Sequence, residues 1–220
     1  MISQIEPAAG KGAAPIYHLK VVLLGTKPPI WRRLQVPGDA TLGWLHAVIQ
    51  VAMGWTNSHL HHFLTRDARY SDPRGNEDMA FGGEPDRDEA RATLMQVMPG
   101  KGARLRYEYD FGDSWEHEIT VAKILPPDAA APAAALCLDG ARACPPEDCG
   151  GVWGYADLLE KLGNPKHPEH QSMQEWLGGS FDAEVFDVTK VNHWLRKLKR
   201  PRVTDAQLRK VLMGRDGYNE

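Results

Sequence analysis

The cysteines of this 220-residue chain are concentrated in one short segment. All three, Cys137, Cys144 and Cys149, lie within thirteen residues, in a C-x6-C-x4-C spacing that differs from the C-x2-C of a common zinc knuckle. Clustered thiols predict a structural zinc site. Two alternatives stay open: a disulfide, or a loop fixed by packing in which the reduced cysteines act as small apolar groups.

A zinc ion held by three thiolates needs a fourth donor, because structural zinc prefers four tetrahedral ligands. His117 is the first candidate, since a hairpin carrying it could lie against the cysteine segment. His167 and His170 are the second choice. The prolines and glycines between and after the thiols stiffen the loop, which lowers the entropy lost when a metal binds.

Asp110, Asp113 and His117 form a second set, spaced D-x2-D-x3-H around an expected hairpin tip. Two carboxylates and an imidazole near a turn could bind a divalent metal or act as acid and base. The alternative is that both aspartates accept hydrogen bonds from backbone N–H groups of the turn, while Trp115 packs in the core.

The string HLHHF supplies a third set. On a strand, His59 and His61 point to the same face and could chelate one metal, while His62 faces the other way. If this strand neighbours the hairpin, His117 would complete a three-imidazole site with a position left open for water. The alternative is a set of structural or solvent-exposed histidines.

Strands and one helix must position these residues in the first half of the chain. Alternation predicts strands over 16–24, 30–36 and 59–66 and a hairpin over 103–111 and 115–125. Apolar residues at helical spacing predict a helix over 39–55 and a short one over 92–98. Residues 67–89, rich in Asp, Gly, Pro and Arg, predict a surface excursion that could act as a lid.

The second half is predicted to be helical, over 155–163, 168–179, 187–199 and 204–213. The fold class is therefore α+β, an antiparallel or mixed sheet packed with helices, with a strand–strand–helix–strand order in the first half that suggests a β-grasp. We expect a loose arm over 1–14, one domain over 15–198 containing the cysteine loop 137–151, and a basic C-terminal extension over 199–220.

Composition and charge restrict the class of protein. Net charge is −3, yet residues 190–220 carry nine Lys and Arg against three Asp and Glu, so a basic end faces an acidic remainder. Trp31 beside Arg32 and Arg33 is a weak sign of nucleic-acid binding, while the seven tryptophans are spread as core anchors would be. No membrane span and no secretory signal are expected, which favours the cytoplasm and reduced thiols.

Three segments carry a resemblance to a known family: HLHHF, YEYDFGDSWEHEI and CPPEDCGGVWGY, with IWRRLQVP before them and GNPKHPEH after. The chain resembles the plasmid pRiA4b ORF-3-like family over residues 16–197. The resemblance implies an α+β fold and bacterial, mobile-element relatives, some of which are labelled as transposon resolvases. The chain lacks an evident serine-recombinase pattern, which argues against that label.

Two functions follow as expectations. The first is a non-enzymatic binding module, with a structural zinc in one version, that recognises a protein or nucleic-acid partner. The second is a metal-dependent hydrolase that would use His59, His61, Asp110, Asp113 and His117, although the acidic remainder of the chain would repel an anionic substrate. The absence of a complete catalytic signature favours the binding module.

Overall fold

One eight-stranded sheet dominates the computed structural model, which describes residues 14–74, 86–127, 134–198 and 205–216. The strands are β1 (Ile16–Leu23), β2 (Ile30–Pro37), β3 (His61–Leu64), β4 (Arg69–Ser71), β5 (Arg87–Asp88), β6 (Arg104–Tyr109), β7 (Trp115–Leu125) and β8 (Leu136–Ala141). Their order is β5-β4-β3-β6-β7-β1-β2-β8. The β4–β5 pair is parallel and the other neighbouring pairs are antiparallel, so the predicted α+β class with a mixed sheet is confirmed.

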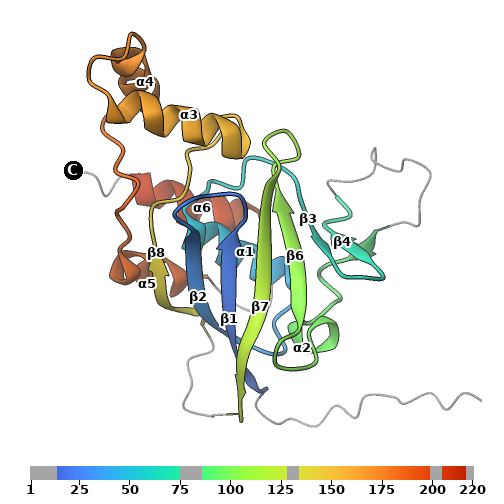
Figure 1. The fold of residues 1–220 in the computed structure, drawn as a ribbon. Helices are drawn as coiled ribbons and strands as arrows, with labels where there is room; N and C mark the ends of the chain where they lie inside the picture. Colours follow the sequence, from blue (N-terminus) through green and yellow to red (C-terminus); the bar gives the residue numbers. More distant parts are fainter. Residues whose placement is uncertain (1–13, 75–85, 128–133, 199–204, 217–220) are drawn as a thin grey trace, which may run out of the picture.

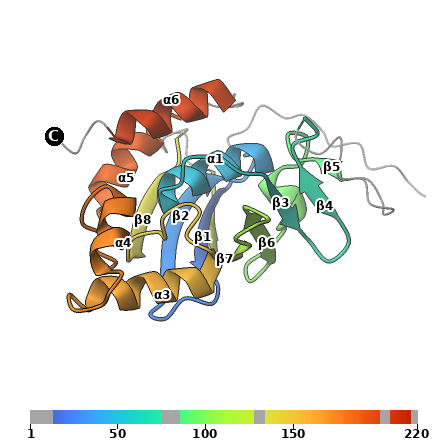
Figure 2. The same ribbon diagram turned by 90° about the horizontal axis from the view of Figure 1, so that it is seen from above.

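Helices cover this sheet and extend beyond it. They are α1 (Leu42–Met53), α2 (Leu94–Val97), α3 (Gly151–Gly163), α4 (His170–Leu177), α5 (Val188–Leu195) and α6 (Asp205–Asp216). Figure 2 shows α1 and α6 on the same side of the sheet, and α5 contacts both α1 and the edge strand β8. In Figure 1, α3 and α4 pack together and project beyond the ends of the strands.

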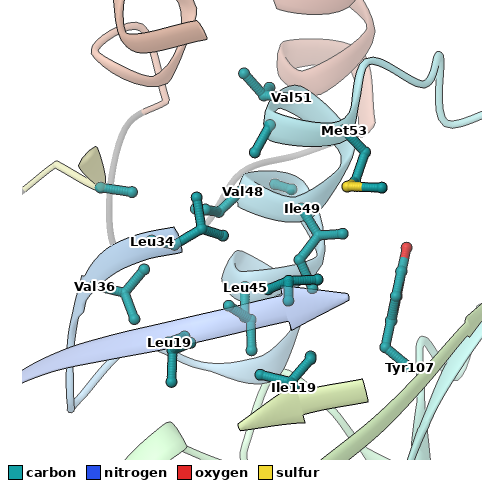
Figure 3. Close-up of a cluster of buried hydrophobic side chains, with 14 of the residues drawn as sticks. Leu19, Leu34, Val36, Leu45, Val48, Ile49, Val51, Met53, Tyr107 and Ile119 are labelled. Atoms are coloured by element: carbon teal, nitrogen blue, oxygen red, sulfur yellow. The ribbon is translucent and has the colours of Figure 1, made fainter. Parts of the chain in front are cut away.

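The central helix α1 begins and ends where its capping residues require. Thr41 Oγ1 accepts a hydrogen bond from Trp44 N–H, and Gly54 ends the helix in a left-handed conformation with φ of 117°. Apolar residues occupy most of its circumference, so the helix is buried on nearly every side. Figure 3 shows Leu45 and Ile49 facing side chains of the strands, including Leu19 and Ile119.

Arg32 is buried within the fold, with 1% of its surface exposed. Its guanidinium donates hydrogen bonds to the backbone oxygens of Trp31, Ala52, Ala141 and Arg142. Arg32 therefore joins the end of α1 to β8 and does not face solvent, so the predicted Trp31–Arg32–Arg33 contact with nucleic acid loses one of its cations.

The structure differs from the sequence-based elements at four places. The predicted strand over 59–66 narrows to β3, and the cysteine loop begins as strand β8, which contains Cys137. β4 and β5 lie inside the predicted excursion, whose residues 75–85 are outside the described residues. Leu208 and Leu212 of α6 belong to the buried core, so part of the predicted C-terminal extension packs against the domain.

Most of the predicted N-terminal arm lies outside the described residues. In the ranges that the structure describes, none of the helices has the length and apolar character needed to cross a bilayer.

Candidate functional site

Three segments that are distant in sequence meet at one end of the sheet. β3 pairs with β6, which places His61 opposite Tyr109. The turn between β6 and β7 contacts the loop before α3, where Gly150 N–H donates a 3.1 Å hydrogen bond to Asp113 Oδ2. The segments that carry the family resemblance thus form one continuous region.

His59 lies at the centre of this region, surrounded by carboxylates. Its Nδ1 is 3.6 Å from Asp110 Oδ1, and its Nε2 is 3.2 Å from Asp148 Oδ1 and 3.9 Å from Glu147 Oε2. One donor atom each from His59, Asp110 and Asp148 lie within 4.8 Å of one another. Among the residues that the structure describes, no other group of three or more His, Cys, Asp or Glu side chains meets this criterion.

The backbone explains how the two aspartates reach His59. Asp110 and Asp148 adopt left-handed conformations with φ of 59° and 56°, which aspartate tolerates better than most residues. Asp110 Oδ1 also accepts a hydrogen bond from Gly112 N–H, so the turn fixes its side chain. The predicted turn bonding is therefore observed for Asp110, which also lies beside His59. The Asp113 carboxylate instead accepts its hydrogen bond from Gly150 N–H, in the loop before α3.

Glu147 anchors the loop through one of its oxygens. Oε1 accepts hydrogen bonds from Thr56 N–H, Thr56 Oγ1 and Tyr109 Oη at 2.7, 2.8 and 3.1 Å. Burial, with a smaller effect of Glu147, raises the pKa of Tyr109 well above its usual range, so the phenol stays protonated as a donor. Oε2 of Glu147 is buried without a hydrogen-bond partner and faces His59.

A cleft of about 860 Å³ opens beside His59. Its walls come from α1, the segment 57–61, residues 72–74 and 88–91, and Leu208 and Arg209 of α6. On one wall His61 Nε2 lies 2.9 Å from Glu89 Oε2, and both side chains are more than 90% buried. Glu89 reaches this position because Gly43 has no side chain: a Cβ there would lie 2.9 Å from Glu89 Oε1.

The imidazole of His46 packs against that of His61. The two rings stack with centroids 3.4 Å apart and planes 2° from parallel. His46 Nε2 donates to Asn57 Oδ1 and its Nδ1 accepts from the Tyr107 hydroxyl, each at 2.8 Å, while Tyr107 accepts from Gln50 Nε2. Burial lowers the pKa of His46 to about 3, so this network holds a neutral imidazole of one tautomer against His61.

The predicted zinc ligands are not brought together. Cys137 lies on the edge strand β8 and His117 on β7, with β1 and β2 between those strands. His117 is fully buried, beside the backbone oxygen of Tyr107 and edge-on to the Trp55 ring. A donor on β7 and a thiol on β8 face different neighbours, so Cys137, Cys144, Cys149 and His117 do not form a group of ligands within 4.8 Å.

The second-choice histidines also lie elsewhere. His170, at the start of α4, bonds the backbone oxygen of Lys161, and His167 accepts from Glu169 N–H. These contacts belong to the connection between α3 and α4. Cys137, Cys144 and Cys149 are not joined by a disulfide, and burial raises the pKa of the Cys137 and Cys149 thiols to about 11 and about 12.

The three imidazoles predicted to share a metal are not grouped as ligands among the described residues. His59 and His61 line the same cleft, and His62 pairs with Glu108 at 3.0 Å. His117 is absent from the cleft lining and lies in the core beneath Trp55. Of the residues predicted for a hydrolase, the structure groups His59 with Asp110, sets His61 nearby, and places Asp113 and His117 outside the group.

Four residues at the site were not predicted from the sequence: His46, Glu89, Glu147 and Asp148. His46 and Gln50 are polar residues four apart on a helix that is otherwise apolar, which was a usable signal. Glu147 and Asp148 lie between Cys144 and Cys149 in a loop, where single carboxylates have no periodic pattern that predicts their partners. Glu89 directly follows β5, which pairs with β4, so no local pattern indicates that its carboxylate reaches His61 of β3.

Comparisons with known proteins give a family model, a similar sequence and a similar solved structure. The family model described as plasmid pRiA4b ORF-3-like protein matches residues 15–190. The uncharacterized protein y4hQ of Sinorhizobium fredii is 38% identical over 197 residues, which cover 85% of this chain and 98% of that protein. The crystal structure of MM3350 from Methanosarcina mazei Go1, a protein of unknown function, is similar with a TM-score of 0.69 and 37% identity, covering 80% of this chain and 96% of that one.

Proposed function

The chain belongs to the plasmid pRiA4b ORF-3-like family, and from this premise we propose that it is a binding module whose ligand is a small polar molecule held in the cleft beside His59. The observation that carries the proposal is the buried His61–Glu89 pair on the cleft wall. A buried ionisable pair is costly to maintain, so its place on a cavity wall favours a role in recognition over one in stability.

The cleft lining supports a ligand with both hydrogen-bond donors and acceptors. Asp72 and Asp88 lie at the wall with Arg74 and Arg91 as their ion-pair partners, and Asn57 and Ser58 add neutral polar groups. Because both signs of charge occur together, the cleft does not favour a strongly anionic or strongly cationic molecule. A volume of about 860 Å³ is in the range of small-molecule sites.

A screen of amino acids, sugars and nucleosides by NMR tests the proposal. We expect at least one compound to shift the amide resonances of residues 57–61 and 86–91, and Glu89→Gln to weaken its binding at least about tenfold. His62→Gln with Glu108→Gln is a matched control, since these residues form a similar His–Glu pair that is not part of the cleft lining. The proposal would be contradicted if Glu89→Gln leaves the affinity unchanged, or if the compound shifts amide resonances only at other surfaces.

Metal-dependent hydrolysis is a second candidate, favoured by one observation. His59 lines the cleft and also belongs to the group with Asp110 and Asp148, so a metal-bound water there would face a ligand in the cleft. If the protein hydrolyses phosphate or carboxylic esters with added Mn²⁺, and Asp148→Asn abolishes this turnover, the protein is a metal-dependent hydrolase and the binding module is rejected. Unchanged turnover in that variant would indicate that a contaminating enzyme causes the activity.

Nucleic acid remains the alternative partner that the basic residues of 190–220 suggest. Most of these residues belong to α5, to α6 or to ranges outside the described residues. Binding of DNA or RNA that weakens steeply as salt is added would favour this alternative over a small ligand.

A further inference from the structure

The surroundings of His59 leave two buried polar atoms without hydrogen-bond partners. His59 Nε2 and Glu147 Oε2 are both buried from solvent without a hydrogen-bond partner and lie 3.9 Å apart, and Nε2 also lies 3.2 Å from Asp148 Oδ1. Buried polar atoms without hydrogen-bond partners destabilise the folded state, so a pair of them facing each other needs an explanation. An atom that each could coordinate would satisfy both.

The charged side chains that lie against His59 are all carboxylates, so negative charge is concentrated there. Asp110, Glu147 and Asp148 contribute three carboxylates, and the ion pairs of these residues within the described ranges are with His59 alone. The Asp110 side chain is 92% buried, which makes an uncompensated carboxylate there unfavourable. A cation would offset this concentration of negative charge.

The distances suit a metal ion more closely than they suit direct hydrogen bonds. Neighbouring ligands of a metal with bonds of about 2.1 Å lie about 3.0–3.5 Å apart, and opposed ligands about 4.2 Å apart. His59 Nε2 is 3.2 Å from Asp148 Oδ1 without a hydrogen-bond geometry, and the donor atoms of the group span at most 4.8 Å. The donor atoms must approach one another by a few tenths of an ångström to bind one ion. Asp148 can make this movement because its side chain is 70% exposed.

We infer that His59, Asp110 and Asp148 form a binding site for a divalent first-row transition metal ion, with Glu147 Oε2 as an adjoining oxygen donor. One imidazole with carboxylates suits Mn²⁺, Fe²⁺ or Zn²⁺ better than the all-oxygen sites that Ca²⁺ and Mg²⁺ prefer. The inference does not depend on what fills the cleft, since the ion would bind in the absence of any other ligand.

Mn²⁺ is the probe that separates this site from the cysteines, because thiolates select softer metals. Titration of the purified chain with Mn²⁺, followed by the loss of the free-ion EPR signal, should give one saturable site per chain. Asp148→Asn is the main variant: asparagine keeps the size and the left-handed backbone, and position 148 is exposed, so the fold is preserved. We expect it to weaken Mn²⁺ binding at least about tenfold, and His59→Gln to weaken it further.

Asp113→Asn is the matched control. It removes one negative charge nearby, yet Asp113 bonds Gly150 N–H and lies outside the group, so its Mn²⁺ affinity should remain within about twofold of the original chain. At the same Mn²⁺ concentration, the ion should also raise the melting temperature of the original chain and of Asp113→Asn by more than it raises that of Asp148→Asn. Absence of saturable binding up to about 1 mM Mn²⁺, or equal weakening by Asp113→Asn and Asp148→Asn, would overturn the metal site and leave the proposed ligand binding in the cleft to its own test.

Discussion

Individual buried histidines set how the stability of this protein depends on pH. Burial lowers the pKa of His46 to about 3 and that of His117 to about 4, while the unfolded chain titrates near the ordinary value of 6.5. Between pH 6.5 and about 4 the unfolded state therefore binds protons that the folded state does not. Their stabilising effect is complete above pH 6.5 and is lost as the pH falls toward the folded values.

We predict that the free energy of unfolding drops between pH 7 and pH 5 by about 2 kcal/mol for each of these two histidines. Urea denaturation at several pH values measures this drop. His117→Gln removes one titrating imidazole, so its drop should be smaller than that of the original chain by about 2 kcal/mol. Equal slopes in the two proteins would show that His117 is not held neutral by the fold.

The cysteines give a second prediction at this scale. Because burial raises the pKa of Cys137 and Cys149, little thiolate forms at pH 8 and both should react slowly with a thiol reagent. In a Cys144→Ser chain, we expect labelling of the native protein to be at least about 100-fold slower than labelling in denaturant. Mass spectrometry of the labelled peptides measures each site, and rapid native labelling of Cys149 would contradict the structure.

At the scale of elements, the site depends on how the β6–β7 turn contacts the start of α3. Gly151 lies against this turn with φ of 66°, and a Cβ at this position would be 2.5 Å from the backbone oxygen of Asp113. Neither partner is a flexible side chain, so the contact cannot be relieved by a rotamer change. This contact sets the position of the loop that carries Glu147 and Asp148.

We predict that Gly151→Ala destabilises the fold by about 1–3 kcal/mol and weakens Mn²⁺ binding, because the loop must move away from the turn. Gly163→Ala, in the last turn of the same helix, meets no atom within 4 Å and should change stability by less than about 1 kcal/mol. Chemical denaturation of the two variants checks the difference. Similar stabilities would mean that the loop and the turn are not in close contact.

Local patterns predicted some of these elements and missed others for physical reasons. Alternation identified β6 and β7, and Thr41 and Gly54 limit α1 as their capping chemistry predicts. The strand β8 was missed because its sequence LCLDGA includes Asp and Gly, which are depleted in strands. The contact between His59 and Asp148 joins positions far apart in the chain, and no local periodicity encodes such a pair.

At the scale of the whole molecule, α6 closes one side of the core and of the cleft. Leu208 and Leu212 are buried, Trp194 of α5 contacts Gly214, and Leu208 and Arg209 also line the cleft. Residues 199–220 are predicted from sequence to form a basic extension because charged residues dominate their composition. Leu208 and Leu212, four residues apart, form an apolar face of α6 that packs against the core, and the net charge of the segment gives no sign of this face.

We predict that a chain ending at residue 198 is less stable than a chain ending at residue 216, because burial of each leucine contributes about 1.5–3 kcal/mol. Thermal denaturation compares the two chains. If the shorter chain does not fold, Leu212→Ala in the full chain tests the same contact, with an expected loss of about 2–4 kcal/mol. Equal stabilities would support an independent extension.

We propose that residues 59, 110 and 147–148, brought together from three parts of the chain, form one functional site beside the cleft that His59 lines. A crystal structure of the full chain with Mn²⁺, with an anomalous difference map, tests it most directly. We expect a peak within about 2.3 Å of a nitrogen of His59 and of oxygens of Asp110 and Asp148. A peak at the cysteines, or an ordered site without any peak at saturating Mn²⁺, would contradict the claim.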